Sequence, residues 1–503
     1  QDRIKELIRE HNLNRLVVAS CTPRTHEPLF RDTARECGLN PFLVDMANIR
    51  DQCSWVHSNE PNAATDKAVD LVRMATARAA RLRALPTEEL PVEQAALVIG
   101  GGPSGMTAAL SLAEQGFPVH LVEKADRLGG RLAPGALRDG LVSRIERHPA
   151  IRTHLSSRLK SLSGHIGSFK AEIEGVGDLT NVKFGALIVA IGGTERKTTE
   201  YCYGLDKRVV TQRDLESMLA SGGIDLPQGA TVGMIQCVGS RDDDHPYCSR
   251  SCCAEAVKNA VRIKELQPDA NVVVLYRDMR TYGVNELHYQ KAREAGVVFV
   301  RYERERPPQV AADGKLTIDF VEPELGVPVR LDLDMLALST GTSPAIDNQS
   351  VSELAKVPLN KDGFFVEAHV KLRPVDFASE GIFLCGSAHS PKTTAENIQQ
   401  GLAAAGRAAT ILSKKTMTVG GQISKVDVRK CVSCLTCVRV CPYGAPEVSA
   451  ANNKNRVEIQ AAKCMGCGSC AAECPAKAIQ LQHYVDRQVE AAIEALLERV
   501  ASH

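Results

Sequence analysis

The stretch LVIGGGPSGMTAALSLAEQGFPVHLVEK, residues 97–124, decides the fold. Gly100, Gly102 and Gly105 have the G-x-G-x-x-G spacing, between an apolar run typical of a strand and a pattern typical of a helix. Glycines at this spacing allow a tight turn, close approach of the backbone to a pyrophosphate, and close packing of helix on strand. Glu123 ends the next apolar run, where a carboxylate accepts a hydrogen bond from a ribose hydroxyl. Because the flanking elements and the acid are both present, the stretch predicts a dinucleotide-binding α/β unit rather than an ordinary glycine-rich turn.

Several later segments resemble two-domain flavoprotein reductases of the thioredoxin-reductase kind, which bind FAD. They are LGGRL at 128–132, GALIVAIGGT at 185–194, LALSTGTSPA at 336–345 and GIFLCGSAH at 381–389. The resemblance implies further FAD contacts from Gly129, Gly130, Arg131, Gly192, Gly341 and Gly386. Ser387 stands where an aspartate is usual in that family, which alters the contacts expected with the ribityl chain.

Composition favours a multidomain protein with metal centres. The 503 residues suffice for several domains, and a net charge of +1 with 4% aromatic residues offers nucleic acid neither a basic field nor stacking surfaces. The 17 cysteines lie mostly at short spacings, which favours metal in a cytoplasmic protein over a disulfide framework. The uncharged run 95–113 has the length of a membrane span, but its four glycines and one proline favour a turn, so we expect no membrane insertion. Because the chain begins with Gln1 inside a helical pattern, we expect a segment to precede it.

The strongest metal signal lies near the C-terminus. CVSCLTCVRVCP at 431–442 and CMGCGSCAAECP at 464–475 both have the C-x2-C-x2-C-x3-C-P spacing of a two-cluster ferredoxin, in which each fourth cysteine ligates the other cluster. The expected ligands are Cys431, Cys434, Cys437 and Cys474 for one [4Fe–4S] cluster, and Cys464, Cys467, Cys470 and Cys441 for the other. A zinc ion would need two C-x2-C pairs, so the duplicated run with both prolines favours iron–sulfur clusters.

A second cysteine group occupies an unusual position. The strand-like run ATVGMIQ, residues 230–236, continues into CVGSRDDDHPYCSRSCC, residues 237–253, where a second glycine fingerprint would bind NAD(P)H. The acidic run Asp242–Asp244 would repel a pyrophosphate there. Cys237, Cys248, Cys252 and Cys253 offer four thiolates, the ligand class of iron–sulfur clusters. Such cysteines also occur as buried inert thiols, but we favour a cluster that replaces nicotinamide as the electron port.

Together these segments predict an α/β fold of four parts. An N-terminal α/β domain is expected over residues 1–90, with a long helix from about Asn62 to Leu85. A thioredoxin-reductase-like FAD domain is expected over 91–228 and 336–415, and a second dinucleotide-binding-like domain with the cysteine group over 229–335. An α+β two-cluster ferredoxin domain is expected over 416–503.

With these parts assembled, the chain resembles the A subunit of heterodisulfide reductase. Besides the two cysteine regions, the resemblance lies in ASCTPRTHEPLF, MANIRDQCSWVHSNEP, VLYRDMRTYG and DGFFVEAHVKLRPVDFASEGIFLCGSAHSPK. It implies a cytoplasmic FAD and iron–sulfur subunit of a hetero-oligomer, between a hydrogenase or formate dehydrogenase donor and other heterodisulfide reductase subunits. In that family the flavin is the proposed site of electron bifurcation between a disulfide-type acceptor and ferredoxin.

The resemblance has departures and leaves some residues open. The cysteine-rich insertion that many members carry after the first flavin unit is missing, so one electron exit is absent or supplied by a partner. Cys21 and Cys53 are candidates for an N-terminal cluster, which would bring the total to three or four, whereas Cys37, Cys202 and Cys385 are expected to be ordinary thiols.

Lys392 in HSPK is either a surface lysine or, because its turn follows the last flavin motif, a catalytic cation that stabilises reduced flavin near N1 or N5.

Three alternative functions share parts of this pattern. A flavin subunit of a quinone-linked sulfur or sulfate-metabolism complex has the same motifs and differs in its partners. A self-contained NAD(P)H-dependent reductase would reduce its flavin with nicotinamide. A wiring scaffold would hold a flavin that never turns over.

Overall fold

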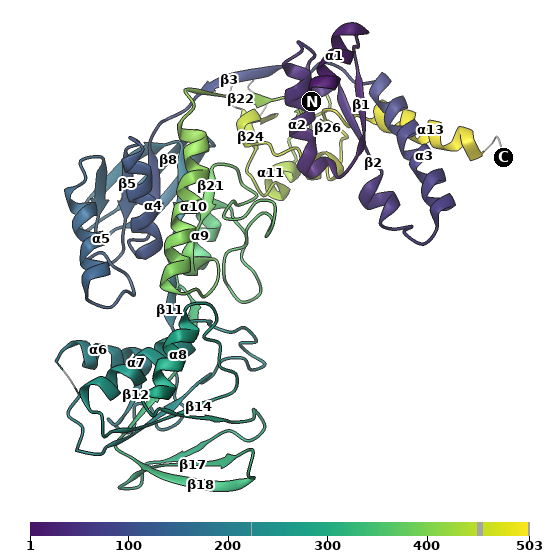
Figure 1. The fold of residues 1–503 in the computed structure, drawn as a ribbon. Helices are drawn as coiled ribbons and strands as arrows, with labels where there is room; N and C mark the ends of the chain where they lie inside the picture. The colour runs from purple at the N-terminus through teal and green to yellow at the C-terminus, as the bar shows by residue number, and fades with distance from the viewer. Residues whose placement is uncertain (223, 450–455, 501–503) are drawn as a thin grey trace. The chain divides into compact units, whose positions relative to one another are not determined.

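The computed structural model describes residues 1–222, 224–449 and 456–500, which form two compact units (Figure 1). One unit comprises residues 1–92 and 415–503 with the short segment 164–166, and the other comprises 93–163 and 167–414. The larger unit is built on two five-stranded parallel sheets, whereas the two-stranded sheets of the smaller unit are mostly antiparallel.

The larger unit begins with a five-stranded parallel sheet in the order β21-β10-β4-β5-β6. Its strands are β4 (Ala96–Ile99), β5 (Val119–Val122), β6 (Ile151–His154), β10 (Ala186–Val189) and β21 (Ile382–Leu384). The helices that accompany this sheet are α4 (Pro103–Glu114), α5 (Ala136–Arg147), α9 (Asn348–Ala355) and α10 (Thr394–Leu412). Every residue of β4 and β10 is buried, as expected of parallel strands that are covered on both faces.

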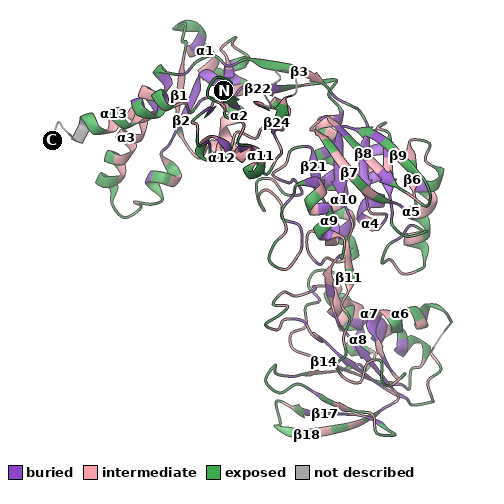
Figure 2. Ribbon diagram, turned by 180° about the vertical axis from the view of Figure 1, so that it is seen from behind, coloured by how far each residue is buried: buried purple, intermediate pink, exposed green. Residues whose placement is uncertain are grey.

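The alternation along β4 separates two apolar cores. Ala96 and Val98 pack with α4 and α10, whereas Leu97 and Ile99 pack with the antiparallel sheet of β7 (Arg158–His165), β8 (Ser168–Glu174) and β9 (Leu179–Phe184). Figure 2 shows the buried residues concentrated in these strands and on the helix faces that cover them. The sheet therefore fixes the turn after β4 between two packed layers.

A second parallel sheet, in the order β12-β19-β13-β14-β15, completes the larger unit. Its strands are β12 (Val209–Thr211), β13 (Thr231–Ile235), β14 (Asn271–Tyr276), β15 (Val298–Arg301) and β19 (Met335–Leu338). Helices α6 (Gln212–Ala220), α7 (Cys252–Leu266) and α8 (Asn285–Glu294) accompany it, as does an antiparallel sheet of β16 (Gln309–Ala311), β17 (Leu316–Glu322) and β18 (Val327–Leu333). The antiparallel ladder of β11 (Gly193–Glu195) and β20 (Thr342–Pro344) lies where the chain passes between the two sheets.

The smaller unit combines both ends of the chain. Its N-terminal part holds α1 (Asp2–Glu10), β1 (Leu16–Ser20), α2 (Pro23–Arg35), β2 (Val44–Asn48), the π-helix η2 (Arg50–Ser54), α3 (Pro61–Ala80) and β3 (Thr87–Pro91). Its C-terminal part holds β22 (Thr416–Gly420), β23 (Ser424–Val426), α11 (Thr436–Val440), β24 (Pro446–Ser449), β25 (Arg456–Ile459), α12 (Ser469–Ala472), β26 (Ile479–Leu481) and α13 (Asp486–Val500). The parts are joined because β3 pairs with β22, and because Gln488 of α13 donates to the Arg81 carbonyl oxygen at 3.2 Å.

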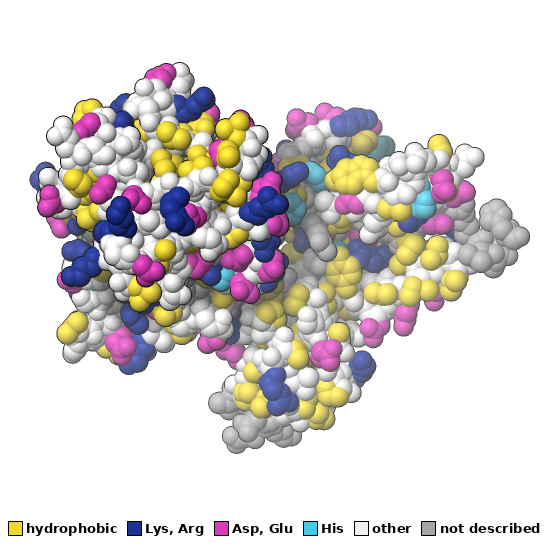
Figure 3. Space-filling model, turned by 90° about the horizontal axis from the view of Figure 1, so that it is seen from below, with side chains coloured by type: hydrophobic (Ala, Val, Ile, Leu, Met, Phe, Trp, Pro, Cys, Tyr) yellow, Lys and Arg dark blue, Asp and Glu magenta, His cyan; other side chains and the backbone are white. Residues whose placement is uncertain are grey.

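The surface is mixed in charge. Acidic and basic side chains lie interspersed with hydrophobic ones on the face in Figure 3, consistent with the formal net charge of +1. Within the described parts of the chain, no helix combines the length and apolar character that a membrane crossing requires.

Candidate cofactor and metal centres

The turn after β4 can be built only with glycine at two of its positions. A Cβ on Gly105 would lie 1.8 Å from the carbonyl oxygen of Gly100, so the helix could not pack on the strand. Gly100 has φ +107°, and a Cβ there would lie 2.3 Å from the Ala190 carbonyl oxygen. Gly102 differs, because its Cβ would meet nothing within 4 Å, and no side chain caps α4 at this residue. The turn thus leaves open space at an uncapped helix N-terminus, which is where a pyrophosphate binds.

Glu123 closes one side of this turn. Its buried carboxylate accepts hydrogen bonds from the backbone N–H of Gly101 at 2.6 Å and of Ala125 at 2.8 Å. The loop that carries Gly129 and Gly130 lies against the same turn, since the Gly129 N–H donates to the Gly101 carbonyl oxygen at 2.9 Å. These contacts fit an FAD whose phosphates and ribose lie at the first turn of α4.

The remaining expected FAD residues fall in two places. Gly386 has φ +74° and lies against Ser104 of α4, whereas Gly192 has φ +73° and open space at its Cβ position. Gly341 instead lies against the 237–253 loop, since a Cβ there would meet Ser249 Oγ at 2.6 Å. Arg131 donates to Thr342 Oγ1 at 3.1 Å, one residue beyond Gly341.

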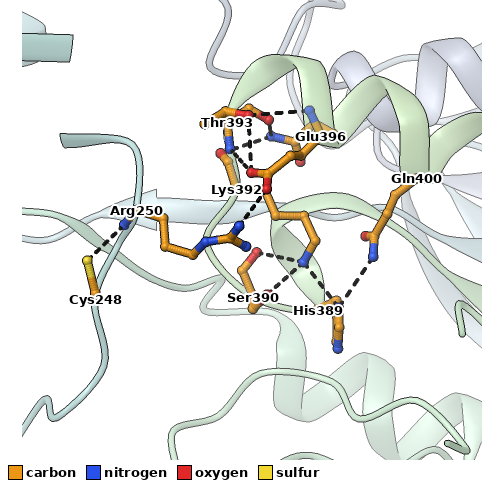
Figure 4. A network of polar contacts seen from close by, with 9 residues as sticks. Cys248, Arg250, His389, Ser390, Lys392, Thr393, Glu396 and Gln400 are labelled. Atoms are coloured by element: carbon orange, nitrogen blue, oxygen red, sulfur yellow. Dashed lines mark hydrogen bonds and ion pairs between the residues drawn. The ribbon is translucent and has the colours of Figure 1, made fainter. Parts of the chain in front are cut away.

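Lys392 lies in a polar network at the start of α10 (Figure 4). Its Nζ donates to Ser390 Oγ at 2.6 Å and lies 3.1 Å from Nδ1 of His389. Burial lowers the pKa of Lys392 to about 8, and the nearby charge of Arg250 acts in the same direction. The side chain is a half-buried cation at neutral pH.

Asn397 connects this network to the phosphate turn. Its Oδ1 accepts from the hydroxyls of Ser104 and Ser387, each at 3.2 Å, and its Nδ2 donates to the Lys392 carbonyl oxygen at 3.3 Å. Lys392 is therefore held beside the candidate FAD site.

The cysteines of the 237–253 loop converge on one cavity. Four cysteines contribute to its lining: Cys237, Cys248, Cys252 and Cys253. The cavity lies at the carboxyl ends of β13 and β14, the edge of a doubly wound sheet where a dinucleotide would bind.

The backbone of this loop is strained. Cys237, Arg241 and Arg250 have φ of +60°, +59° and +61°, a region that residues other than glycine seldom occupy. Strain of this kind concentrates at functional sites, where the surrounding structure must hold it.

Burial also raises the pKa values of Cys252 and Cys253. It raises the pKa of Cys253 to about 11 and that of Cys252 well above its usual range. These two thiols are therefore protonated at neutral pH until a metal displaces their protons.

The eight C-terminal cysteines surround two further cavities in the combinations that a two-cluster ferredoxin requires. Cys431, Cys434, Cys437 and Cys474 line one cavity, and Cys441, Cys464, Cys467 and Cys470 line another. In each case the fourth cysteine comes from the other run. Among the described residues, no three His, Cys, Asp or Glu side chains form a group suited to a single metal ion.

Cys21 and Cys53 follow the carboxyl ends of the paired strands β1 and β2, but their thiols have different partners. Cys21 Sγ lies 3.9 Å from Oδ1 of Asp51, whereas the buried Cys53 donates to the Ala64 carbonyl oxygen at 2.6 Å. The structure therefore gives these two cysteines no common partner among the described residues.

Four charged residues of the loop cavity were not expected from the sequence. Arg241, Arg250, Asp278 and Arg280 line it together with the cysteines. Asp278 and Arg280 lie in VLYRDMRTYG, just beyond β14, and the adjacency of β13 and β14 could have indicated their position.

The cysteine loop also contacts the FAD-like part of the same unit. Ser249 Oγ accepts from the Thr342 N–H at 2.8 Å, and Arg250 forms an ion pair with Glu396 of α10 at 2.5 Å. Figure 4 shows that Arg250 lies between Cys248 and the α10 network. The loop cavity and the Lys392 network are thus parts of one connected region.

The comparisons with known proteins agree with this arrangement. Residues 98–186 match the NAD(P)-binding Rossmann-like domain and residues 420–478 the 4Fe-4S dicluster domain. Among solved structures, the thioredoxin reductase of Lactococcus lactis is 17% identical with a TM-score of 0.44, covering 63% of this chain and 99% of its own.

Two curated relatives match almost throughout. The iron–sulfur A subunit, numbered 2, of the CoB--CoM heterodisulfide reductase of Methanopyrus kandleri is 35% identical, covering 90% of this chain and 85% of its own. The A subunit of the H(2):CoB-CoM heterodisulfide,ferredoxin reductase of Methanothermobacter marburgensis is 33% identical, covering 100% of this chain and 91% of its own. The chain belongs to the family of heterodisulfide reductase A subunits.

Proposed function

We propose that the chain is the FAD- and iron–sulfur-containing electron-transfer subunit of a heterodisulfide reductase-like complex. The observation that carries this proposal is the four-cysteine cavity at the edge of the second sheet, where a reductase would bind NAD(P)H. A cluster in that cavity would connect the flavin to one-electron carriers, and the acidic residues Asp242–Asp244 disfavour the NAD(P)H-dependent alternative.

The chain's own residues would hold FAD at the first turn of α4. Backbone N–H groups beyond Gly102 would face the pyrophosphate, and Glu123 would accept a hydrogen bond from a ribose hydroxyl. Bound FAD would supply exchange between two-electron and one-electron transfer. Lys392 would add a positive charge beside the site, which favours the reduced flavin.

The metal proposal comprises three [4Fe–4S] clusters with full ligand sets. Two use the eight C-terminal cysteines, and the third uses Cys237, Cys248, Cys252 and Cys253. A fourth cluster at Cys21 and Cys53 would need two ligands besides these.

The partners would be other heterodisulfide reductase-like subunits. The name of the Methanothermobacter relative joins H2, a heterodisulfide and ferredoxin, whereas a Methanosarcina acetivorans relative is named Ferredoxin/F(420)H(2)-dependent. Donors thus differ among relatives, and a hydrogenase or formate dehydrogenase module is our proposal for this chain. Bifurcation would send one electron toward a disulfide-type acceptor and one toward ferredoxin.

The test compares metal content after anaerobic reconstitution of the full chain. The parent should hold about twelve iron atoms, and the double variant Cys252→Ser, Cys253→Ser should lose about four of them. The matched control, Cys37→Ser with Cys202→Ser, also removes two thiols and should keep all the iron. If the Cys252 and Cys253 variant keeps the parent's iron, the loop cysteines are inert thiols and the proposal fails.

A further inference from the structure

The three cavities are each lined by four cysteines but have different surroundings. In the described structure, the two C-terminal cavities have no charged side chain in their linings, which consist otherwise of apolar, small or neutral polar residues. Arg439 contacts the carbonyl oxygen of Cys434 at 3.0 Å, but it is exposed and does not line the cavity.

The loop cavity is lined by charge instead. Arg241, Arg250 and Arg280 contribute to its wall, and Asp278 is the acidic residue among them. The guanidinium Nη1 of Arg241 lies 4.0 Å from Cys237 Sγ.

The ion pairs of these arginines leave a positive balance. Asp278 pairs with Arg241 at 2.5 Å and with Arg280 at 4.0 Å, and Glu396 pairs with Arg250 at 2.5 Å. The cavity lining thus holds three positive charges and one negative charge. Outside the lining, the charge of Arg277 also acts on Cys237, and those of Arg131 and Glu255 act on Cys252.

Backbone hydrogen bonds to sulfur do not distinguish the three centres. The Arg250 N–H donates to Cys248 Sγ at 3.3 Å. Comparable bonds run from the Ala445 N–H to Cys441 Sγ at 3.4 Å and from the Ala478 N–H to Cys474 Sγ at 3.3 Å. The differences that remain are side-chain charge, solvent exposure, and the hydroxyl contacts that Cys434, Cys467 and Cys470 make in the C-terminal centres.

Charge beside a cluster acts directly on its reduction. A [4Fe–4S] cluster with four thiolates is an anion, and the added electron makes it more negative, so neighbouring cations favour the reduced form. None of the four loop cysteines is exposed, so water screens these interactions less than at the C-terminal centres, where Cys434 and Cys467 are exposed. Since exposure itself also favours added charge, the contribution of the arginines is best isolated by removing them.

We propose that Arg241, Arg250 and Arg280 make the loop centre easier to reduce than either C-terminal centre. This inference rests on the proposed cluster at the loop cysteines. It assigns that cluster the highest reduction potential of the three centres in the chain. A flavin connected to centres of unequal potential would release its two electrons to acceptors of unequal strength.

The experiment is an anaerobic redox titration of the reconstituted full chain, followed by electron paramagnetic resonance. The loop centre's signal is identified as the one lost in the Cys252→Ser, Cys253→Ser variant. In the parent it should be reduced first. Arg241→Gln should lower its reduced-to-oxidised ratio at a fixed potential roughly tenfold, which is about 59 mV for one electron. Arg280→Gln should act in the same direction, whereas Asp278→Asn should raise the ratio.

The matched control is Arg304→Gln. Arg304 pairs with Asp243 of the same loop at 2.7 Å but does not line the cavity, so its removal should leave the titration unchanged. A loop centre that is reduced last, or an Arg241→Gln curve that overlays the parent, would overturn the inference alone. About eight iron atoms per chain with no third signal would overturn it together with the proposed loop cluster.

Discussion

Lys392 shows how one side chain can depend on several elements. Its amine contacts Ser390 and His389, and its carbonyl oxygen accepts a hydrogen bond from Asn397. Burial lowers its pKa to about 8, so the amine is mostly charged at pH 7 and mostly neutral above pH 9. Any effect of its charge on a neighbouring cofactor should follow the same titration.

We therefore expect Lys392→Ala to make the flavin harder to reduce at pH 7. A tenfold loss of the reduced form corresponds to about 30 mV for the two-electron couple. The difference from the parent should shrink as pH rises through about 8, because the parent lysine then loses its charge. Lys392→Arg, which stays charged at both pH values, should match the parent potential at pH 7 and make the flavin easier to reduce than in the parent at pH 9. Anaerobic redox titrations at both pH values measure this. If the Lys392→Ala curve overlays the parent curve at pH 7, Lys392 has no effect on the flavin.

Site residues that have a fixed local spacing could be predicted from the sequence, whereas those brought together by the fold could not. The G-x-G-x-x-G turn and the ferredoxin runs are specified within a few residues, so their geometry follows from local order. Arg241 and Arg280 reach one cavity only because β13 and β14 are neighbours in the sheet. Gly341 and Arg131 were expected from the family pattern, but their surroundings at the cysteine loop depend on how the two sheets join.

Helix α4 illustrates a requirement at the scale of an element. Gly105 lies in contact with the preceding strand, whereas Gly406 in α10 has no atom within 4 Å of its Cβ position. Replacing either by alanine adds the same methyl group to a helix.

Gly105→Ala should destabilise the protein by about 1–3 kcal/mol, because the methyl group collides with the Gly100 carbonyl oxygen, and the purified variant should lose FAD. Gly406→Ala should instead stabilise it by about 0.5–1 kcal/mol, since alanine loses less conformational entropy in a helix. Denaturant unfolding and flavin content measure both effects. Equal stabilities for the two variants would contradict the packing described for α4.

Element boundaries depended on tertiary contacts. The helix expected from about Asn62 to Leu85 ends at Ala80, although Leu82 and Leu85 are still buried. Arg15 donates to the Leu82 carbonyl oxygen at 2.8 Å, a bond to a distant strand region that the helical pattern could not indicate. The strands β7 to β9 were likewise not predicted. Their buried residues pack against Leu97 and Ile99 of β4, a contact that the local sequence does not show.

At the scale of the whole molecule, the larger unit carries four cysteines at the carboxyl ends of β13 and β14 in its second parallel sheet. We expect NADH and NADPH to leave the flavin oxidised under anaerobic conditions, because the edge of the second sheet carries Asp242–Asp244 and four cysteines. Absorbance of the bound flavin measures this. Dithionite, a reductant that needs no nucleotide site, should bleach the same sample. Rapid bleaching by micromolar NADH would favour the self-contained reductase instead.

The central claim is that iron and sulfide occupy the cavity of Cys237, Cys248, Cys252 and Cys253. Anomalous diffraction at the iron absorption edge, from crystals of the anaerobically reconstituted chain, tests it most directly. The account predicts three peaks, two within the C-terminal cavities and one centred among the loop cysteines. Peaks at the C-terminal cavities alone, with the loop thiols protonated and packed together, would contradict it.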